Sequence, residues 1–274
     1  MTTPSLTLQP RVAPRVPGSF GTRRSTHLVE RNLVAYRRMW MLLLTGALEP
    51  LFYLFSVGVG LGKLIPEVTG PAGTPVRYVD FVAPALLATA AMNGAMFDAT
   101  FGIFFRLKYA KTYDAVLATP LTPPDIALGE LIWCLIRGGL YAVAFTVVVS
   151  FFGVMHSPWA VLAVPAALLV SVAFAGLGMA IATYMKSWQD FEAVTLLMMP
   201  MFLFSTTFFP LGVYPRGLQL VVEATPLYQG IEIIRGLMLG VVDPGMLLRV
   251  LYLALMAAGG LAIAARRFGR LLTS

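Results

Sequence analysis

The chain has 274 residues, of which 58% are hydrophobic and 12% are charged, and its formal net charge is +7. Soluble domains carry roughly 25% charged residues, so this composition excludes an ordinary soluble enzyme and favours a membrane protein. The Lys and Arg residues lie mostly in the N-terminal segment and between apolar stretches, where they indicate membrane topology and contact with anionic lipid headgroups rather than nucleic-acid binding. Cys134 is the only cysteine, so neither a disulfide framework nor a thiolate metal site is expected.

Six long apolar stretches follow one another along the chain. Each approaches the ~20 residues that a helix needs to cross the ~30 Å core of a bilayer, and a backbone in hydrocarbon must satisfy its own hydrogen bonds within a helix. The stretches cover residues 40–62, 79–104, 128–152, 159–184, 192–209 and 246–265. The sequence therefore predicts an all-α polytopic membrane protein, with six transmembrane helices in one domain over residues 28–274.

The distribution of positive charge predicts the orientation of these spans. With the N-terminus inside, 14 of the 20 Lys and Arg residues fall on the cytoplasmic side, as the positive-inside rule requires. Six spans then place both termini in the cytoplasm. We expect a multi-pass protein of a bacterial plasma (inner) membrane.

The N-terminal segment divides into two parts. Residues 1–27 carry prolines and arginines but no acidic residue, which predicts a disordered cytoplasmic tail. From there, Val29, Leu33, Tyr36 and Trp40 recur at helical spacing. The basic residues on another side of this helix are Arg31, Arg37 and Arg38. The pattern indicates either an amphipathic helix in the inner headgroup plane or the beginning of the first span.

The loop between the second and third stretches is the most polar interior segment. A short amphipathic helix is expected there, and the Thr-Pro pairs that follow end it. Thr122 or Asp125 could cap the third span. The loop either docks a partner or is an ordinary solvated loop. The residues that would make such a contact are Lys108, Tyr109, Lys111, Tyr113 and Asp114.

Three ionisable residues lie inside the predicted spans. Glu49, Asp98 and Arg137 reach a similar depth, ~10–14 Å from the inner surface at ~1.5 Å per residue. A charge at mid-bilayer costs ~2.5–3.5 kcal/mol on insertion scales. The three residues either line a substrate path as a polar network or form a structural ion pair between helices. The two acids also leave a proton-coupled secondary carrier as an alternative function.

The segment from residue 210 to 240 is apolar but interrupted by prolines. Its pieces, 216–222 and 227–239, are too short to cross a membrane and are expected to be re-entrant or interfacial helices at the outer side. Glu232 and Arg235 should pair locally at i, i+3. Four aromatic residues suit the headgroup level and form either an outer gate or an aromatic belt. They are Phe208, Phe209, Tyr214 and Tyr228.

Several runs of residues match a known family. The run Lys-Thr-Tyr-Asp-Ala-Val-Leu-Ala-Thr-Pro-Leu-Thr-Pro-Pro-Asp-Ile-Ala-Leu-Gly-Glu at 111–130 closely resembles the cytoplasmic loop of ABC type-2 transporter permeases, among them nodulation lipo-oligosaccharide and daunorubicin exporter permeases. Residues 48–53 resemble their first span. The stretch between their fifth and sixth spans resembles residues 209–215, 226–227 and 230–235. The resemblance covers about residues 28–240 in the family's order.

The resemblance implies a permease subunit of an ATP-driven exporter for an amphipathic drug, lipid or glycolipid. It implies a second permease copy or homologue and two copies of a separate ATPase, which would hold the ATP and Mg²⁺. It places a coupling element at residues 108–118 and an interfacial helix at 31–40. Gly62-Lys63 is followed by Leu64 and does not form a phosphate-binding loop. We expect no catalytic, cofactor or metal site in this chain, since His27 and His156 lie on opposite sides of the membrane. A non-transporting scaffold is a further class.

Overall fold

The computed structural model describes residues 48–65, 67–117 and 121–273. The predicted tail at 1–27 and the predicted interfacial helix at 31–40 therefore lie outside the described residues. Within them the chain is helical apart from one small hairpin and the turns. The all-α class predicted from composition and periodicity is confirmed.

Within the described residues, four helices are long and apolar enough to cross a membrane. They correspond to the second, third, fourth and sixth predicted spans. One continuous helix, Tyr78–Lys108, comprises α4 (Tyr78–Phe97), the π-helical turn η3 (Asp98–Gly102) and α5 (Ile103–Lys108). The others are α7 (Pro123–Phe151), η4 (Pro158–Leu162) followed by α8 (Ala163–Ala182), and α12 (Gly245–Thr273).

The other two predicted spans are not among these four. The described part of the first begins at Leu48 and is an apolar helix over Leu48–Gly62, which contains the π-helical η1 (Leu54–Val59) and α3 (Gly60–Gly62). The fifth, α9 (Gln189–Phe204), has 16 residues. It ends where Thr206 adopts a φ of 59°, a left-handed conformation that turns the chain out of the helix. The count of six spanning helices stays a prediction.

Short elements join these helices at both ends of the bundle. A hairpin of β1 (Glu67–Thr69) and β2 (Pro75–Arg77), connected through η2 (Pro71–Gly73), follows the first helix, and Glu67 pairs with Arg77. Its strands are too short to give an alternating sequence pattern. The elements α6 (Thr112–Leu117), η5 (Leu211–Val213), α10 (Arg216–Glu223) and α11 (Pro226–Leu239) complete the chain. The bounds of α10 and α11 agree with the predicted short helices to one residue.

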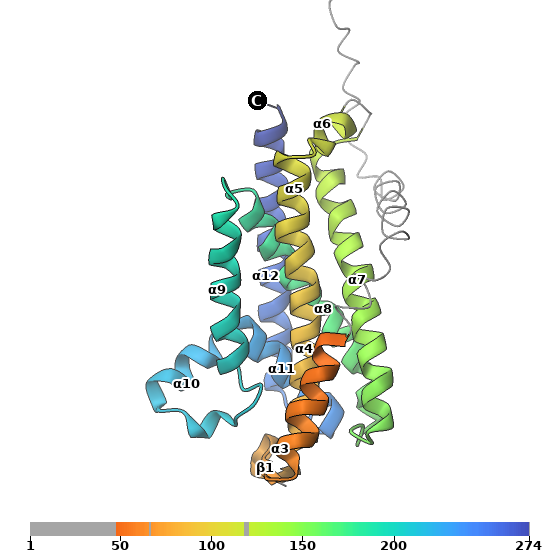
Figure 1. Cartoon of the computed structure of the whole chain (residues 1–274), viewed down its shortest axis with the longest axis vertical. Helices are drawn as coiled ribbons and strands as arrows, with labels where there is room; N and C mark the ends of the chain where they lie inside the picture. Colours follow the sequence, from red (N-terminus) through yellow and green to blue (C-terminus); the bar gives the residue numbers. More distant parts are fainter. Residues whose placement is uncertain (1–47, 66, 118–120, 274) are drawn as a thin grey trace, which may run out of the picture.

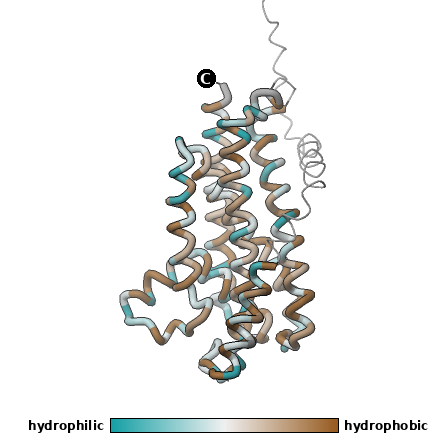
Figure 2. The backbone as a smooth tube through the Cα atoms, in the orientation of Figure 1, coloured by the Kyte–Doolittle hydropathy of each residue, from teal (hydrophilic) through white to brown (hydrophobic). Residues whose placement is uncertain are grey.

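The four long helices run along the long axis of the molecule (Figure 1). α6 and the C-terminal end of α12 lie at one end of the bundle, and β1 and α3 lie at the other, while α9 stands to one side. α8 packs against α4, α7 and α12, and α11 packs against α4, α8 and α12. Apolar residues extend along the middle of the helices, with hydrophilic residues more frequent toward the ends (Figure 2).

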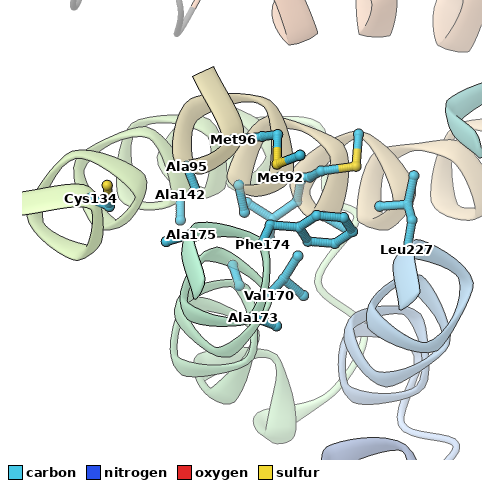
Figure 3. Packing of buried hydrophobic residues seen from close by; sticks show 14 of the residues in the cluster. Met92, Ala95, Met96, Cys134, Ala142, Val170, Ala173, Phe174, Ala175 and Leu227 are labelled. Carbon is cyan, nitrogen blue, oxygen red and sulfur yellow. The ribbon is translucent and has the colours of Figure 1, made fainter. Parts of the chain in front are cut away.

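The core is centred on α8. Phe174 lies among Val170 of its own helix, Met92 of α4 and Leu227 of α11 (Figure 3). Where α8 crosses α12, a Cβ added to Gly176 would stand 2.8 Å from the carbonyl oxygen of Ala257. Only glycine permits this approach of two backbones, and small residues at such crossings are the usual device of membrane helices. The bundle therefore holds the surrounding helices in fixed positions around one rigid centre.

Candidate functional site

A cavity of about 580 Å³ lies between the helix Leu48–Gly62, α4, α7 and α9. This volume is within the ~300–1,000 Å³ that is typical of small-molecule sites. The cavity exists because α9 does not pack closely on the bundle, and none of its residues is buried. α9 instead touches the neighbouring helix through aromatic rings. The centroid of Phe101 is 5.2 Å from that of Trp188 and 5.5 Å from that of Phe191.

The two sides of the cavity differ in chemistry. The α4 and α7 side carries most of the polar lining residues, among them Asn93 and Tyr141, beside the apolar Leu86 and Phe97. Gly94 is required there, because an added Cβ would stand 2.8 Å from the ring of Tyr141. The α9 side is apolar apart from Thr195. Its residues recur at intervals of three and four, so one stripe of the helix faces the cavity: Phe191, Val194, Met198, Met199, Phe202 and Leu203.

Arg137 and Asp98 form a buried ion pair beside this cavity. Arg137 Nη1 donates to Asp98 Oδ1, and Arg137 Nε donates to the hydroxyl of Tyr141 at 3.0 Å. Both charged side chains are almost entirely buried. Asp98 opens the π-helical turn η3, and such turns within α-helices frequently mark functional sites. The pair joins η3, which continues α4, to α7. Both residues are among the three charges that the sequence predicts within the spans.

Glu49 differs from these two residues. It lines the same cavity, but its side chain is exposed and makes no hydrogen bond or ion pair with any described residue. The structure thus brings Asp98 and Arg137 together, whereas Glu49 lines the cavity from the first helix.

A second buried cluster lies at the end of the bundle that carries α6. Glu130 of α7 is completely buried. Its Oε2 is 3.1 Å from Arg106 Nη2 of α5, and its Oε1 accepts a hydrogen bond of 3.1 Å from the hydroxyl of Tyr113. The ring of Tyr113 packs edge-on against Phe268 of α12, at 5.8 Å between centroids. α6 is therefore attached to α5, α7 and α12 together.

Tyr113 is one of the residues that the sequence predicts to contact a partner, and a contact of its ring with another subunit stays a prediction. In this chain the Tyr113 side chain is completely buried. It holds α6 in place. The residues that are exposed at this corner are Lys108, Tyr109 and Lys111. Arg31, Arg37 and Arg38 lie outside the described residues, as does the side chain of Asp114.

The start of α7 follows its sequence signals. The backbone N–H and the hydroxyl of Thr122 both donate to Asp125 Oδ2, at 3.0 and 2.6 Å. This capping box satisfies groups that a helix end would leave unpaired. Its effect is to fix the first turn of α7.

Arg235 organises the opposite end of the bundle. The predicted pair with Glu232 is confirmed at 2.7 Å. Arg235 is nevertheless buried, and its guanidinium also donates to the carbonyl oxygen of Thr206 at 2.7 Å and to that of Phe81 at 3.2 Å. The Cζ atom of Arg235 lies 3.8 Å from the centroid of the Phe81 ring. One residue of α11 therefore fixes both α4 and the turn that ends α9, a role that the i, i+3 spacing did not indicate.

The four aromatic residues expected at an outer gate do not form one cluster. Phe208 lines the cavity and contacts Phe202, with 5.3 Å between ring centroids. Tyr228 is buried in α11, where burial raises the pKa of its hydroxyl. Phe209 is half exposed, and the ring centroid of Tyr214 lies 6.1 Å from that of Phe204. Only Phe208 is placed where it could control access to the cavity.

A polar corner at this same end had no signal in the sequence. Asp80, in the first turn of α4, accepts two hydrogen bonds of 2.8 Å from Arg77 and lies 3.0 Å from His156 Nε2. Arg77 also donates to the carbonyl oxygen of Gly153 at 3.0 Å. The corner joins the hairpin to the turn after α7. Among the residues that the structure describes, no three His, Cys, Asp or Glu side chains gather as a metal site would require.

Comparison with known proteins gives a consistent result. The model of the family described as "ABC-2 type transporter" matches residues 25–239. The chain is similar to Nodulation protein J of Rhizobium meliloti (strain 1021), with 34% identity over 214 residues that cover 77% of this chain and 79% of the relative. The protein of the same name from Rhizobium leguminosarum bv. trifolii is 35% identical over 214 residues, with the same coverage of 77% and 79%. That of Sinorhizobium fredii (strain NBRC 101917 / NGR234) is 32% identical over 229 residues, covering 83% and 86%.

Proposed function

This chain belongs to the ABC-2 type transporter family, and from that premise we propose that it is the permease subunit of an ATP-driven exporter for an amphipathic substrate. The observation that carries the proposal is the cavity between α4, α7 and α9, because α4 and α7 belong to helices that are long enough to cross a membrane. Most of the polar lining residues are on α4 and α7 and most of the α9 lining is apolar, as a molecule with a polar and an apolar part requires. Drug, lipid and glycolipid all remain within this class.

The energy for transport would come from a separate ATPase. The corner formed by the end of α5 and the start of α6 is the proposed docking site, since Lys108, Tyr109 and Lys111 are exposed there. Tyr113 and Glu130 connect this corner to α7 and α12. A displacement imposed on α6 by a partner would therefore move the helices that line the cavity. ATP and Mg²⁺ would be bound by the partner.

The proposed assembly contains two permease chains and two ATPase chains. The support for a second permease is the state of α9, which has no buried residue and exposes Leu196, Leu197 and Met199. A second copy or a homologue seated beside α9 would close the cavity from that side. We place the assembly in a bacterial plasma membrane with α6 and both termini in the cytoplasm.

The proton-coupled carrier is less well supported. Asp98 is one of the two acids that this mechanism needs, and it is paired with Arg137 in the interior. A carrier that used Asp98 would have to break this pair in each transport cycle. No observation favours a scaffold without transport.

The proposal can be tested by reversing the exposed charges of the docking corner. The chain is co-expressed with candidate ABC ATPase subunits from the same genome, and Lys108→Glu with Lys111→Glu is compared with Lys63→Glu. Lys63 is also exposed but belongs to the opposite end of the molecule. We expect the double variant to insert normally, to lose co-purification of the ATPase, and to lose ATP-dependent export from reconstituted vesicles. Undiminished ATP-dependent export by the double variant would contradict this docking site, and export that needs a proton gradient but no ATP would contradict the exporter.

A further inference from the structure

The environment of Glu49 indicates what kind of ligand the cavity takes. Glu49 lines the cavity, its side chain is exposed, and it makes no ion pair with a described residue. A bare carboxylate at membrane depth is unfavourable by several kcal/mol, and intramembrane acids of this kind normally face a cavity or a counter-charge. Glu49 therefore acts as an available negative charge on the cavity wall.

The other charge on the wall does not balance it. Arg137 is the cationic side chain among the described lining residues, and it is already neutralised by Asp98 behind the wall. The described lining and its buried support thus contain two acids and one base. An anionic headgroup would meet this excess of negative charge, whereas a cation would be attracted to it.

The rings of the cavity provide a second, independent observation. Tyr53 lies one helical turn after Glu49 and touches Phe202 of α9, with 5.6 Å between ring centroids. Phe97, Phe191 and Phe208 also line the space. Aromatic faces attract cations, and quaternary ammonium groups are commonly recognised by several rings together. A carboxylate beside such rings suits an organic amine better than a hydrated metal ion.

We propose that the cavity binds a cationic amphiphile, a tertiary or quaternary amine on an aromatic or single-chain alkyl body, with Glu49 as the counter-charge of the amine. The apolar body would lie along the α9 wall, against Met198 and Phe202. The identification of this ligand as the transported substrate rests on the proposed function. Binding itself needs neither the ATPase nor transport, so the two proposals can fail separately.

The test uses two photoreactive probes that differ only in charge. One is benzophenone-decyl-trimethylammonium, and the other is the sulfate of the same benzophenone-decyl chain. Benzophenone inserts readily into C–H bonds beside the sulfur of methionine, and Met198 and Met199 line the cavity. The full chain is labelled in neutral phosphatidylcholine nanodiscs, and the modified peptides are quantified by mass spectrometry. We expect the cation to label the α9 peptide at least about tenfold more than the anion, as a charge-assisted contact in a low-dielectric site provides.

Equal labelling by the two probes, or stronger labelling by the sulfate, would overturn the proposal on the unmutated chain, without reliance on any variant. Where the unmutated chain prefers the cation, Glu49→Gln should abolish the preference, and Glu49→Asp should retain part of it. Glu67→Gln, which removes an exposed carboxylate outside the cavity, should leave it unchanged. A preference for the cation that persists in Glu49→Gln would exclude Glu49 as the counter-charge.

Discussion

Single charged residues inside the bundle have specific partners, and these partners determine what each residue does. Arg137 is paired with Asp98, and Glu130 with Arg106. Arg235 has no acid within the core and is satisfied instead by two backbone carbonyls, an aromatic face and Glu232 at the edge. Each of these groups would be costly to leave alone, because a buried charge without a partner loses its solvation and gains nothing in return.

The pair of Asp98 and Arg137 should show this cost directly. Arg137→Leu leaves a buried carboxylate, so we expect the free energy of unfolding in detergent to fall by about 3–5 kcal/mol. Adding Asp98→Asn should recover part of that loss, since the stranded charge is then removed. Arg249→Leu is the matched control, because its pair with Asp243 is partly exposed and such pairs contribute about 0–1 kcal/mol. Equal stability of the Arg137 and Arg249 variants, or additive effects of the two changes at 98 and 137, would contradict a structural pair.

Elements differ in how firmly they are attached to the bundle. α6 is short, but Tyr113 fixes it to α7 by a hydrogen bond and to α12 by ring packing. α9 is longer, yet it buries no residue and is attached mainly at its ends. In its first turn, Asp190 accepts hydrogen bonds from the backbone N–H groups of Lys186 and Ser187, which precede the helix and lower the pKa of its carboxyl group. At its end, Arg235 holds Thr206.

The attachment of α6 can be weakened without removing the ring. Tyr113→Phe deletes only the hydroxyl that donates to Glu130 and should cost about 1–3 kcal/mol locally, because a buried acceptor loses its partner. We expect faster amide hydrogen exchange over residues 112–117, with α8 unaffected. Tyr109→Phe, at a ring that is 59% exposed, provides the control and should exchange as the parent does. Unchanged exchange in Tyr113→Phe would show that the hydroxyl does not hold the helix.

At the scale of the whole molecule, the two ends of the bundle have separate roles. The end that carries α6 presents exposed lysines, and the opposite end carries the hairpin, α10 and the Arg235 contacts. The cavity lies between them, and α4 and α7 line it while extending toward both ends. A change at the α6 end can reach the cavity along these helices without rearrangement of the α8 core.

This division requires a particular orientation in the membrane. Single cysteines at Lys108 and Thr74, each in a Cys134→Ala background, lie at exposed positions at opposite ends of the molecule. We expect Thr74→Cys to react with an impermeant thiol reagent in intact cells, and Lys108→Cys to react only after the membrane is opened. The reverse pattern would invert the orientation and remove the cytoplasmic docking corner.

The sequence could predict the lengths of helices better than their contacts. The bounds of α10 and α11, the cap of Thr122 with Asp125 and the pair of Glu232 with Arg235 all depend on residues close together in the chain, where spacing is informative. The burial of Tyr113 against Glu130 could not be predicted in this way. α4, α7 and α8 are apolar around their whole circumference, so periodicity does not show which side faces a neighbour. The cluster around Glu130 was therefore found only in the structure.

The two ion pairs that join α4, η3 and α5 to α7 have a consequence for the synthesis of this protein. The helix Tyr78–Lys108 carries Asp98 and Arg106, and α7 carries Glu130 and Arg137. Insertion of either helix alone into lipid would therefore be unfavourable, since a charge at mid-bilayer costs ~2.5–3.5 kcal/mol. Because the acid is on the first helix in one pair and on the second in the other, only one register neutralises both. The two helices should leave the translocon as a hairpin that is already charge-matched. The insertion efficiency of each segment can be measured alone and with the two segments joined. We expect insertion to be more efficient when they are joined, and Asp98→Arg to remove this gain.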